Sequence, residues 1–199
     1  MVIHTAMRLR KWEPLCRAFE VVVPDIIAGE MMFFDDKDKR RVYVVVESAP
    51  TAGLHRFSVV QAAGGPRVPD TVQGGEFAIW QAPAADFLQT KAMLHPELSS
   101  RFHDGEQEAV TYLRLAANPH EIRFVTADAG AIQAAVAFGL SDCPISLEAV
   151  LKSCGHQTAL DNEFCDEHVK ACVRMGGQRV ATDRALAPAP IDKARKKRR

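Results

Sequence analysis

Two short apolar runs in this chain are each followed at once by a segment with the spacing of a helix. The first run, EVVVP at 20–24, leads into PDIIAGEMMFF at 24–34, and the second, RFVT at 123–126, leads into an Ala-rich segment. Short continuous apolar runs are typical of strands buried in a parallel sheet, and proline suits the first turn of a helix. Strands that alternate with helices favour an α/β fold with a mainly parallel central sheet.

The residue pattern changes between residues 35 and 95, where the runs RRVYVVVES and HRFSVVQ occur together with glycine pairs. These patterns predict a β-rich insertion of hairpins and loops with a connecting helix. A length of 199 residues suits one domain with embellishments. We predict a domain over 1–155 that contains this insertion, a helical extension over 156–187 with a helix at 161–175, and a disordered basic tail over 188–199.

The charged residues balance, with 25 Lys and Arg against 25 Asp and Glu, so the overall charge indicates neither a nucleic-acid nor a membrane partner. The basic residues nevertheless gather in the last segment, KARKKRR. Its side chains could contact RNA phosphates by counterion release, or the segment could be a solvated end that keeps a neutral protein soluble. The candidate RNA-binding residues are Lys196, Lys197, Arg198 and Arg199.

Five cysteines at irregular spacing, without a secretory signal, indicate a reducing cytoplasm. No apolar stretch reaches the roughly 18 residues of a membrane span, so we expect no membrane partner. Between residues 154 and 172 three cysteines lie near two histidines, but their spacing matches no standard zinc pattern. We expect thiols packed as small apolar groups there rather than zinc. The residues are Cys154, His156, Cys165, His168 and Cys172.

Three acidic residues occupy places where a carboxylate needs a physical explanation. Glu30 and Glu106 each share the apolar face of a predicted helix, and Asp128 follows the strand at 123–126. An ionised carboxylate in apolar surroundings is expensive unless a cation neutralises it. Oxygen ligands with no His or Cys beside them suit Mg²⁺ or Mn²⁺, and an open α/β sheet binds ligands at the carboxyl ends of its strands. These acids are therefore candidate metal ligands.

Each acid also has a plainer interpretation. Asp128 precedes a helix, where aspartate is among the commonest N-caps. Glu30 and Glu106 could lie at the edges of their apolar faces and reach water or a basic neighbour. Both interpretations remain open for all three residues.

Other local signals predict structure rather than chemistry. Asp104 with Gln107 three residues on predicts a capping box, and Ser146 predicts the N-cap of a short helix. The run MVIHT at 1–5 predicts a short strand, and the glycine pair at 176–177 predicts a turn.

The blocks VVVPDIIAGE, DGEQEA and FVTADAGAIQAAVAFGL, in this order and followed by ISLEAVL, resemble those of the PIN-domain family, a metal-dependent ribonuclease fold. The resemblance covers most of residues 1–152, strongly at 104–152 and weakly through the insertion. It implies a three-layer α/β/α fold that cleaves RNA phosphodiester bonds with Mg²⁺ or Mn²⁺.

Matched position by position, the resemblance implies that Glu30, Glu106 and Asp128 are the metal ligands and that Thr126 orients water or phosphate. It further implies RNA as the substrate and a homodimer as the assembly. If the chain is the toxin of a toxin–antitoxin pair, its protein partner is the antitoxin.

One feature of the family has no counterpart in this chain. PIN domains begin with a strand that ends in an Asp metal ligand, whereas MVIHT resembles the part just after it and no acidic residue precedes Glu13. We expect either an upstream Asp in a longer or differently started chain, or a site weakened by the loss of one ligand. In the second case the alternative function is a catalytically silent PIN-like module that binds RNA or protein.

Overall fold

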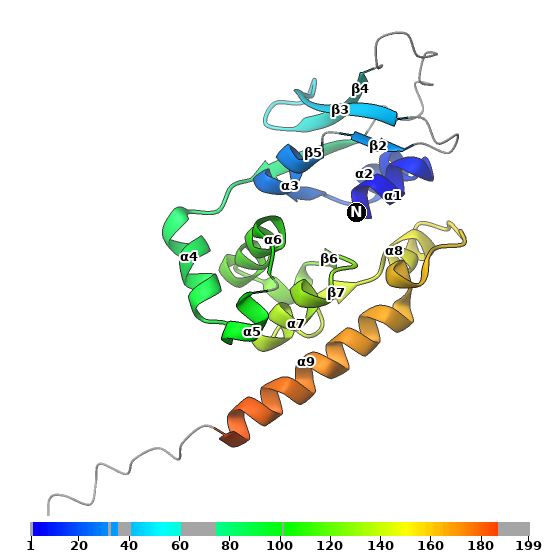
Figure 1. Ribbon diagram of the computed structural model, residues 1–199. Helices are drawn as coiled ribbons and strands as arrows, with labels where there is room; N and C mark the ends of the chain where they lie inside the picture. Colours follow the sequence, from blue (N-terminus) through cyan, green and yellow to red (C-terminus); the bar gives the residue numbers. More distant parts are fainter. Residues whose placement is uncertain (1, 32, 36–40, 61–74, 101, 187–199) are drawn as a thin grey trace, which may run out of the picture.

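The computed structural model describes residues 2–31, 33–35, 41–60, 75–100 and 102–186, which form a mixed α/β fold (Figure 1). The basic residues Lys196, Lys197, Arg198 and Arg199 lie outside the described residues.

The larger sheet has five strands in the order β1-β5-β4-β3-β2. The strands are β1 (Val22–Pro24), β2 (Phe33–Asp35), β3 (Arg41–Ser48), β4 (His55–Val60) and β5 (Glu76–Trp80). Only β1 and β5 pair in parallel in this sheet, and the other three pairs are antiparallel. The prediction of a mainly parallel central sheet is therefore wrong for the described strands, because the hairpin strands of the insertion add to the edge of β5 and extend the sheet.

A second, separate sheet consists of β6 (Phe124–Val125) and β7 (Pro144–Ile145), which pair in parallel. The helices are α1 (Val2–Arg8), α2 (Trp12–Ala18), α3 (Asp25–Glu30), α4 (Ala84–Ala92), α5 (Pro96–Ser99), α6 (Asp104–Leu115), α7 (Ala129–Ala137), α8 (Leu147–Ser153) and α9 (Asp166–Leu186). Short 3₁₀ turns lie at Pro119–Glu121 and Asn162–Phe164.

Two predictions near the start of the chain are wrong. The first residues form α1 instead of a strand, because a helix lets Ala6 and Met7 enter the main apolar core. The predicted helix at 24–34 ends at Glu30 as α3, and Phe33 instead pairs with Tyr43 of β3 in the antiparallel ladder.

Three aromatic side chains connect the inserted hairpin to the rest of the fold. Trp12 of α2 lies with its ring centroid 5.4 Å from that of Phe57 on β4 and 5.8 Å from that of Phe77 on β5. Phe57 and Phe77 are fully buried, with their centroids 4.3 Å apart. Aromatic pairs at such separations add to the stabilisation from buried area. The insertion therefore shares one core with the strand–helix units.

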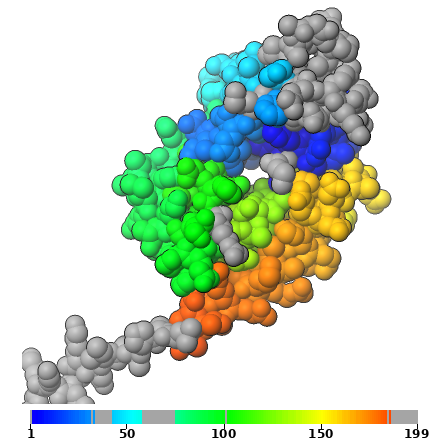
Figure 2. All heavy atoms as spheres, in the orientation of Figure 1, coloured from blue at the N-terminus to red at the C-terminus, as the bar shows by residue number. Residues whose placement is uncertain are grey.

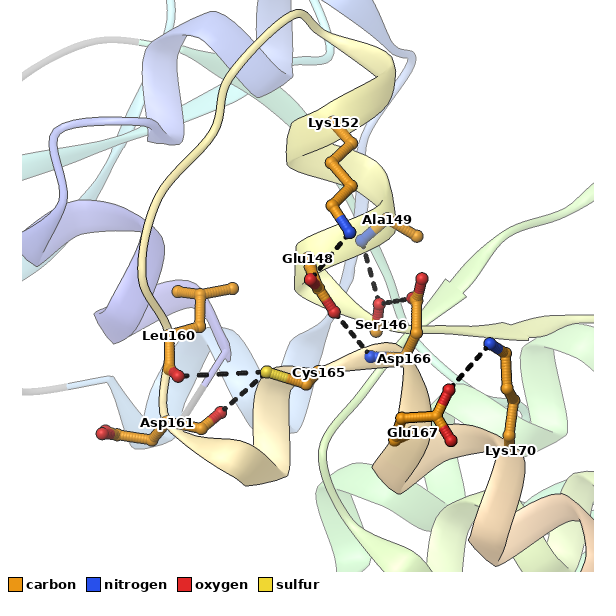
Figure 3. Close-up of polar contacts among 10 residues, drawn as sticks. All are labelled: Ser146, Glu148, Ala149, Lys152, Leu160, Asp161, Cys165, Asp166, Glu167 and Lys170. Atoms are coloured by element: carbon orange, nitrogen blue, oxygen red, sulfur yellow. Dashed lines mark hydrogen bonds and ion pairs between the residues drawn. The ribbon is translucent and has the colours of Figure 1, made fainter.

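The junction between α8 and α9 is closed by interlocking caps (Figure 3). Ser146 Oγ accepts a hydrogen bond from the Ala149 backbone N–H at 2.9 Å, as the sequence predicts, and also donates to the Asp166 carboxylate. Glu148 Oε2 accepts from the Asp166 backbone N–H at 2.9 Å, while its Oε1 accepts from Lys152. At each helix start one orphan N–H donor is thus satisfied by a side chain of α8 or of its cap.

Helix α9 runs along α7 and continues through the glycine pair at 176–177, so the predicted turn there is wrong (Figure 1). A Cβ on Gly176 would lie 3.1 Å from Val136 Cβ and 3.3 Å from Gln133 Cα, both in α7. A Cβ on Gly177 would meet nothing within 4 Å. Gly176 is therefore present for close helix packing and not for its backbone freedom.

The two adjacent glycines provide a matched test of this packing. We expect Gly176→Ala to be less stable than Gly177→Ala by about 1 kcal/mol, because both gain helix propensity but only the first crowds α7. Chemical denaturation of both variants measures the difference. Equal stabilities would contradict the close approach of α9 to α7.

Candidate functional site

The start of α6 is held at the carboxyl ends of the two parallel strands by a buried carboxylate. Glu108 is only 2% exposed. Its Oε2 accepts from the Ile26 backbone N–H, just after β1, and its Oε1 accepts from the Ala82 backbone N–H, just after β5, each at 2.8 Å. One side chain thereby joins α6 to the segments that leave β1 and β5, and both of its oxygens are satisfied.

A neighbouring side of α6 is fixed to α4. Gln107 Nε2 donates to the Phe87 carbonyl oxygen at 2.6 Å, and Thr111 Oγ1 lies 3.0 Å from Thr90 Oγ1. Gln107, Thr111 and Thr90 are fully buried, so these hydrogen bonds form away from water. The orientation of α6, and with it the position of its first turn, is therefore set from two sides.

Glu106 lies half-buried in that first turn, and the end of α3 packs directly against it. A Cβ on the preceding residue, Gly105, would lie 2.7 Å from Ile27 Cγ1 and 3.5 Å from Glu30 Oε2. The glycine therefore permits an approach that brings the Glu30 carboxylate to the start of α6. Glu30 itself is exposed, which agrees with the interpretation that it lies at the edge of its apolar face.

Asp128 is the N-cap of α7, as the plainer interpretation predicts. Its Oδ1 accepts from the Ala131 backbone N–H at 2.7 Å, and Thr126 Oγ1 accepts from the Asp128 backbone N–H at 3.1 Å. Among the described residues the cap uses Oδ1 alone, so Oδ2 can serve a second partner. Capping and ligand binding are therefore compatible roles for this side chain.

Helix α9 supports the same turn from the other side. His168 Nε2 lies 3.0 Å from the Ala127 carbonyl oxygen, and Cys172 Sγ lies 3.6 Å from the same ring nitrogen. Ile132 of α7 packs with Val169 and Cys172 beneath this contact. The backbone between Thr126 and Asp128 is thus held by β6, α7 and α9 together.

The charges of two other acids act on Glu106. Burial is the main cause that raises the pKa of Glu106, and the negative charges of Asp128 and Glu30 raise it further. A hydrogen bond from its own backbone N–H and the charge of His103 lower the pKa, but the net shift is upward. The Asp128 and Glu30 carboxylates therefore both lie near enough to Glu106 for their charges to disfavour its ionised form. Within the described parts of the chain, no Lys or Arg forms an ion pair with any of the three.

This donor set suits a hard divalent cation. Carboxylate oxygens at three helix ends would lose their mutual repulsion when such an ion binds, and carboxylates are the ligands that Mg²⁺ and Mn²⁺ prefer. The arrangement is wider than a closed ligand shell. In the described residues, the one group of His, Cys, Asp or Glu side chains that places three ligand atoms within 4.8 Å of one another consists of His120, Asp142 and Cys143.

The acids belong to elements on two sides of a hollow in the molecular surface. Figure 2 shows this hollow between the blue N-terminal elements, which include α3, and the green to yellow elements, which include α7. A different pocket, of about 490 Å³, lies beside α8 and the segment that follows it, with Lys152, His156 and Leu160 in its wall. None of the predicted site residues lines that second pocket.

The capping box predicted for Asp104 is wrong. Asp104 is the first residue of α6, and its N-cap is His103, which makes no capping hydrogen bond. The Asp104 carboxylate faces Lys91 instead, with Oδ1 4.0 Å from Nζ. Since Gln107 points inward to Phe87, it cannot reach back to the cap.

Sequence patterns missed Glu108, the most buried acid of the site region. Predicting burial from the apolar face of a helix assumes that only one face is buried, whereas α6 buries residues on several sides. The spacing of residues in the sequence does not distinguish the buried Glu108 from an exposed glutamate. Its role depends on backbone N–H groups of two distant segments, which only the fold brings together.

Comparisons of the chain with protein-family models, with curated proteins and with solved structures found no match. No helix in the described part of the chain is both long enough and apolar enough to span a membrane.

The electrostatics of Glu106 predict a pH-dependent effect on stability. Because its pKa is raised in the folded protein, ionised Glu106 destabilises the fold as the pH rises above the unfolded value, and the cost is absent below that value. In chelator at neutral pH we expect Glu106→Gln to be more stable than the wild type by a few tenths of a kcal/mol, after solvent screening.

Thermal denaturation at neutral pH and near pH 4 measures this effect, with Glu20→Gln, an exposed glutamate outside the cluster, as the control. The advantage of Glu106→Gln should disappear near pH 4. A Glu106→Gln protein that is less stable than the control at neutral pH would contradict the repulsion.

Proposed function

We propose that the chain is a PIN-type ribonuclease that cleaves RNA phosphodiester bonds with Mg²⁺ or Mn²⁺ held by Glu30, Glu106 and Asp128. The observation that supports this best is the position of Glu106. It lies half-buried at the start of α6, where the charges of Asp128 and Glu30 act on it, and no Lys or Arg of the described residues forms an ion pair with it. The three-layer PIN-like arrangement belongs to the same proposal.

The chemistry follows from the donor set. A divalent ion polarises a phosphoryl oxygen and lowers the pKa of bound water, which suits phosphodiester hydrolysis at neutral pH. Glu30, Glu106 and Asp128 would supply its negative ligands. Glu106 lies in the first turn of α6 and Asp128 caps α7, and helix N-termini favour the negative charge of phosphate.

Thr126 has a defined part in this scheme. Its Oγ1 already accepts the Asp128 backbone N–H, so its hydroxyl proton remains to donate to water or to a phosphate oxygen. The side chain is buried, and its rotamer is therefore set before a substrate arrives. Thr126 orients a group and holds the turn, whereas the acids bind the cation.

A catalytically silent module that binds RNA or protein is the second candidate. The observation that favours it is α1, where residues 2–8 form a helix that contains no acidic residue. No carboxylate from this segment can therefore complete the three acids. A cage with fewer carboxylates binds a hard cation less tightly, so catalysis would be weakened before binding is lost.

Cleavage of a labelled single-stranded RNA by the full chain in Mn²⁺ tests the proposal. We expect Asp128→Asn to reduce the rate by at least about a hundredfold, because it removes a charged ligand, while asparagine still caps α7. Asp104→Asn is the matched control, since Asp104 lies on the same helix end as Glu106 but faces Lys91. The control should keep the wild-type rate.

Two outcomes would count against the enzyme. Equal cleavage rates for the wild type and Asp128→Asn would show that the acids take no part in the reaction and that a contaminant cleaves the RNA. RNA that binds with the same affinity with and without Mn²⁺, and is never cleaved, would favour the silent module.

A further inference from the structure

A second group of metal-binding side chains lies at the opposite end of the small parallel sheet. His120 belongs to the 3₁₀ turn before β6, and Asp142 and Cys143 directly precede β7. Because β6 and β7 run in parallel, these residues are at the amino ends of both strands, whereas Thr126 and Asp128 follow the carboxyl end of β6. The group is therefore separate from the three acids proposed as catalytic ligands.

The donor atoms of this group are already close together. His120 Nδ1 lies 2.9 Å from each carboxylate oxygen of Asp142, and Cys143 Sγ lies 4.0 Å from Asp142 Oδ1. One ligand atom from each residue falls within 4.8 Å of the other two. Tetrahedral Zn²⁺ with bonds of 2.0–2.3 Å separates its ligand atoms by about 3.3–3.8 Å. Adjustments of up to about one ångström in these side chains would therefore convert the observed spacing to that of a zinc site.

The backbone around the group is well fixed. Cys143 is fully buried, its thiol donates to the Pro119 carbonyl oxygen at 3.2 Å, and its carbonyl accepts from the Phe124 N–H at 2.8 Å. Arg123 Nη1 lies 3.5 Å from the Asp142 carbonyl oxygen. The side chains of His120 and Asp142 are 61% and 54% exposed, so an ion can reach these two ligands from solvent, with the buried Cys143 thiol behind them.

We propose that His120, Asp142 and Cys143 bind Zn²⁺, with water in the fourth position. One nitrogen, one oxygen and one sulfur ligand are the mixed donors that Zn²⁺ accepts, whereas Mg²⁺ and Mn²⁺ prefer oxygen alone. Binding displaces the thiol proton of Cys143 to solvent, and the neutral His120 ring offers Nδ1 to the ion with its proton on Nε2. The carboxylate and the thiolate then neutralise the charge of the ion.

Sequence spacing gives no sign of this site. His120 and Asp142 are 22 residues apart, and the expectation against zinc concerned only the cysteines and histidines between 154 and 172. The proposal does not depend on ribonuclease activity, because it uses neither the residues nor the end of the sheet assigned to that activity.

Metal titration of the full, reduced chain after removal of bound ions tests the site. Zn²⁺ is titrated against a chromophoric chelator, and Co²⁺ is used as a spectroscopic substitute. We expect stoichiometric Zn²⁺ and a thiolate-to-cobalt charge-transfer band. His120→Gln and Asp142→Asn should each weaken Zn²⁺ binding by at least about tenfold, because removal of even an outer-shell partner costs that much.

The controls separate this site from other groups in the chain. Both ligand variants alter exposed side chains, so circular dichroism should show an intact fold, and Cys143→Ser should abolish the cobalt band. Cys165→Ser removes a thiol beside three acids, and Glu106→Gln changes the proposed catalytic site; neither should alter Zn²⁺ affinity. Unchanged affinity in His120→Gln, or a cobalt complex with no thiolate band, would overturn the proposal.

Discussion

The two hydrogen bonds that the buried Glu108 carboxylate accepts are the interaction on which the site region depends. They satisfy the N–H groups of Ile26 and Ala82, which leave the two parallel strands of the larger sheet. A buried carboxylate without partners would be strongly destabilising, commonly by about 3–5 kcal/mol when a buried pair is broken. The strands, α3 and α6 therefore assemble as one unit around this side chain.

This constraint explains why a second glutamate on the same helix can face the surface. Residues two apart on an α-helix are separated by about 200° around its axis, so Glu106 and Glu108 point to nearly opposite sides. Glu108 is used entirely by the backbone of the fold, whereas Glu106 is left beside Glu30 and Asp128. Glu108 therefore fixes the position of α6, and Glu106 takes part in the proposed metal binding.

Local patterns in the sequence predicted the elements that depend on neighbouring residues. The strand–helix unit around β6 and α7, the helix α6, and the caps by Asp128 and Ser146 are all confirmed. Features that depend on distant residues were missed: the antiparallel extension of the sheet, the packing role of Gly176, and the partners of Glu108. That Glu30, Glu106 and Asp128 are metal ligands remains a prediction; the structure shows only that the charges of Glu30 and Asp128 act on Glu106.

The cation site proposed at Glu30, Glu106 and Asp128 is tested most directly by a crystal of the full chain grown with Mn²⁺, with anomalous diffraction collected near the manganese edge. We expect an anomalous peak bounded by the three carboxylates. A well-ordered map with no peak between these carboxylates at saturating Mn²⁺ would contradict it.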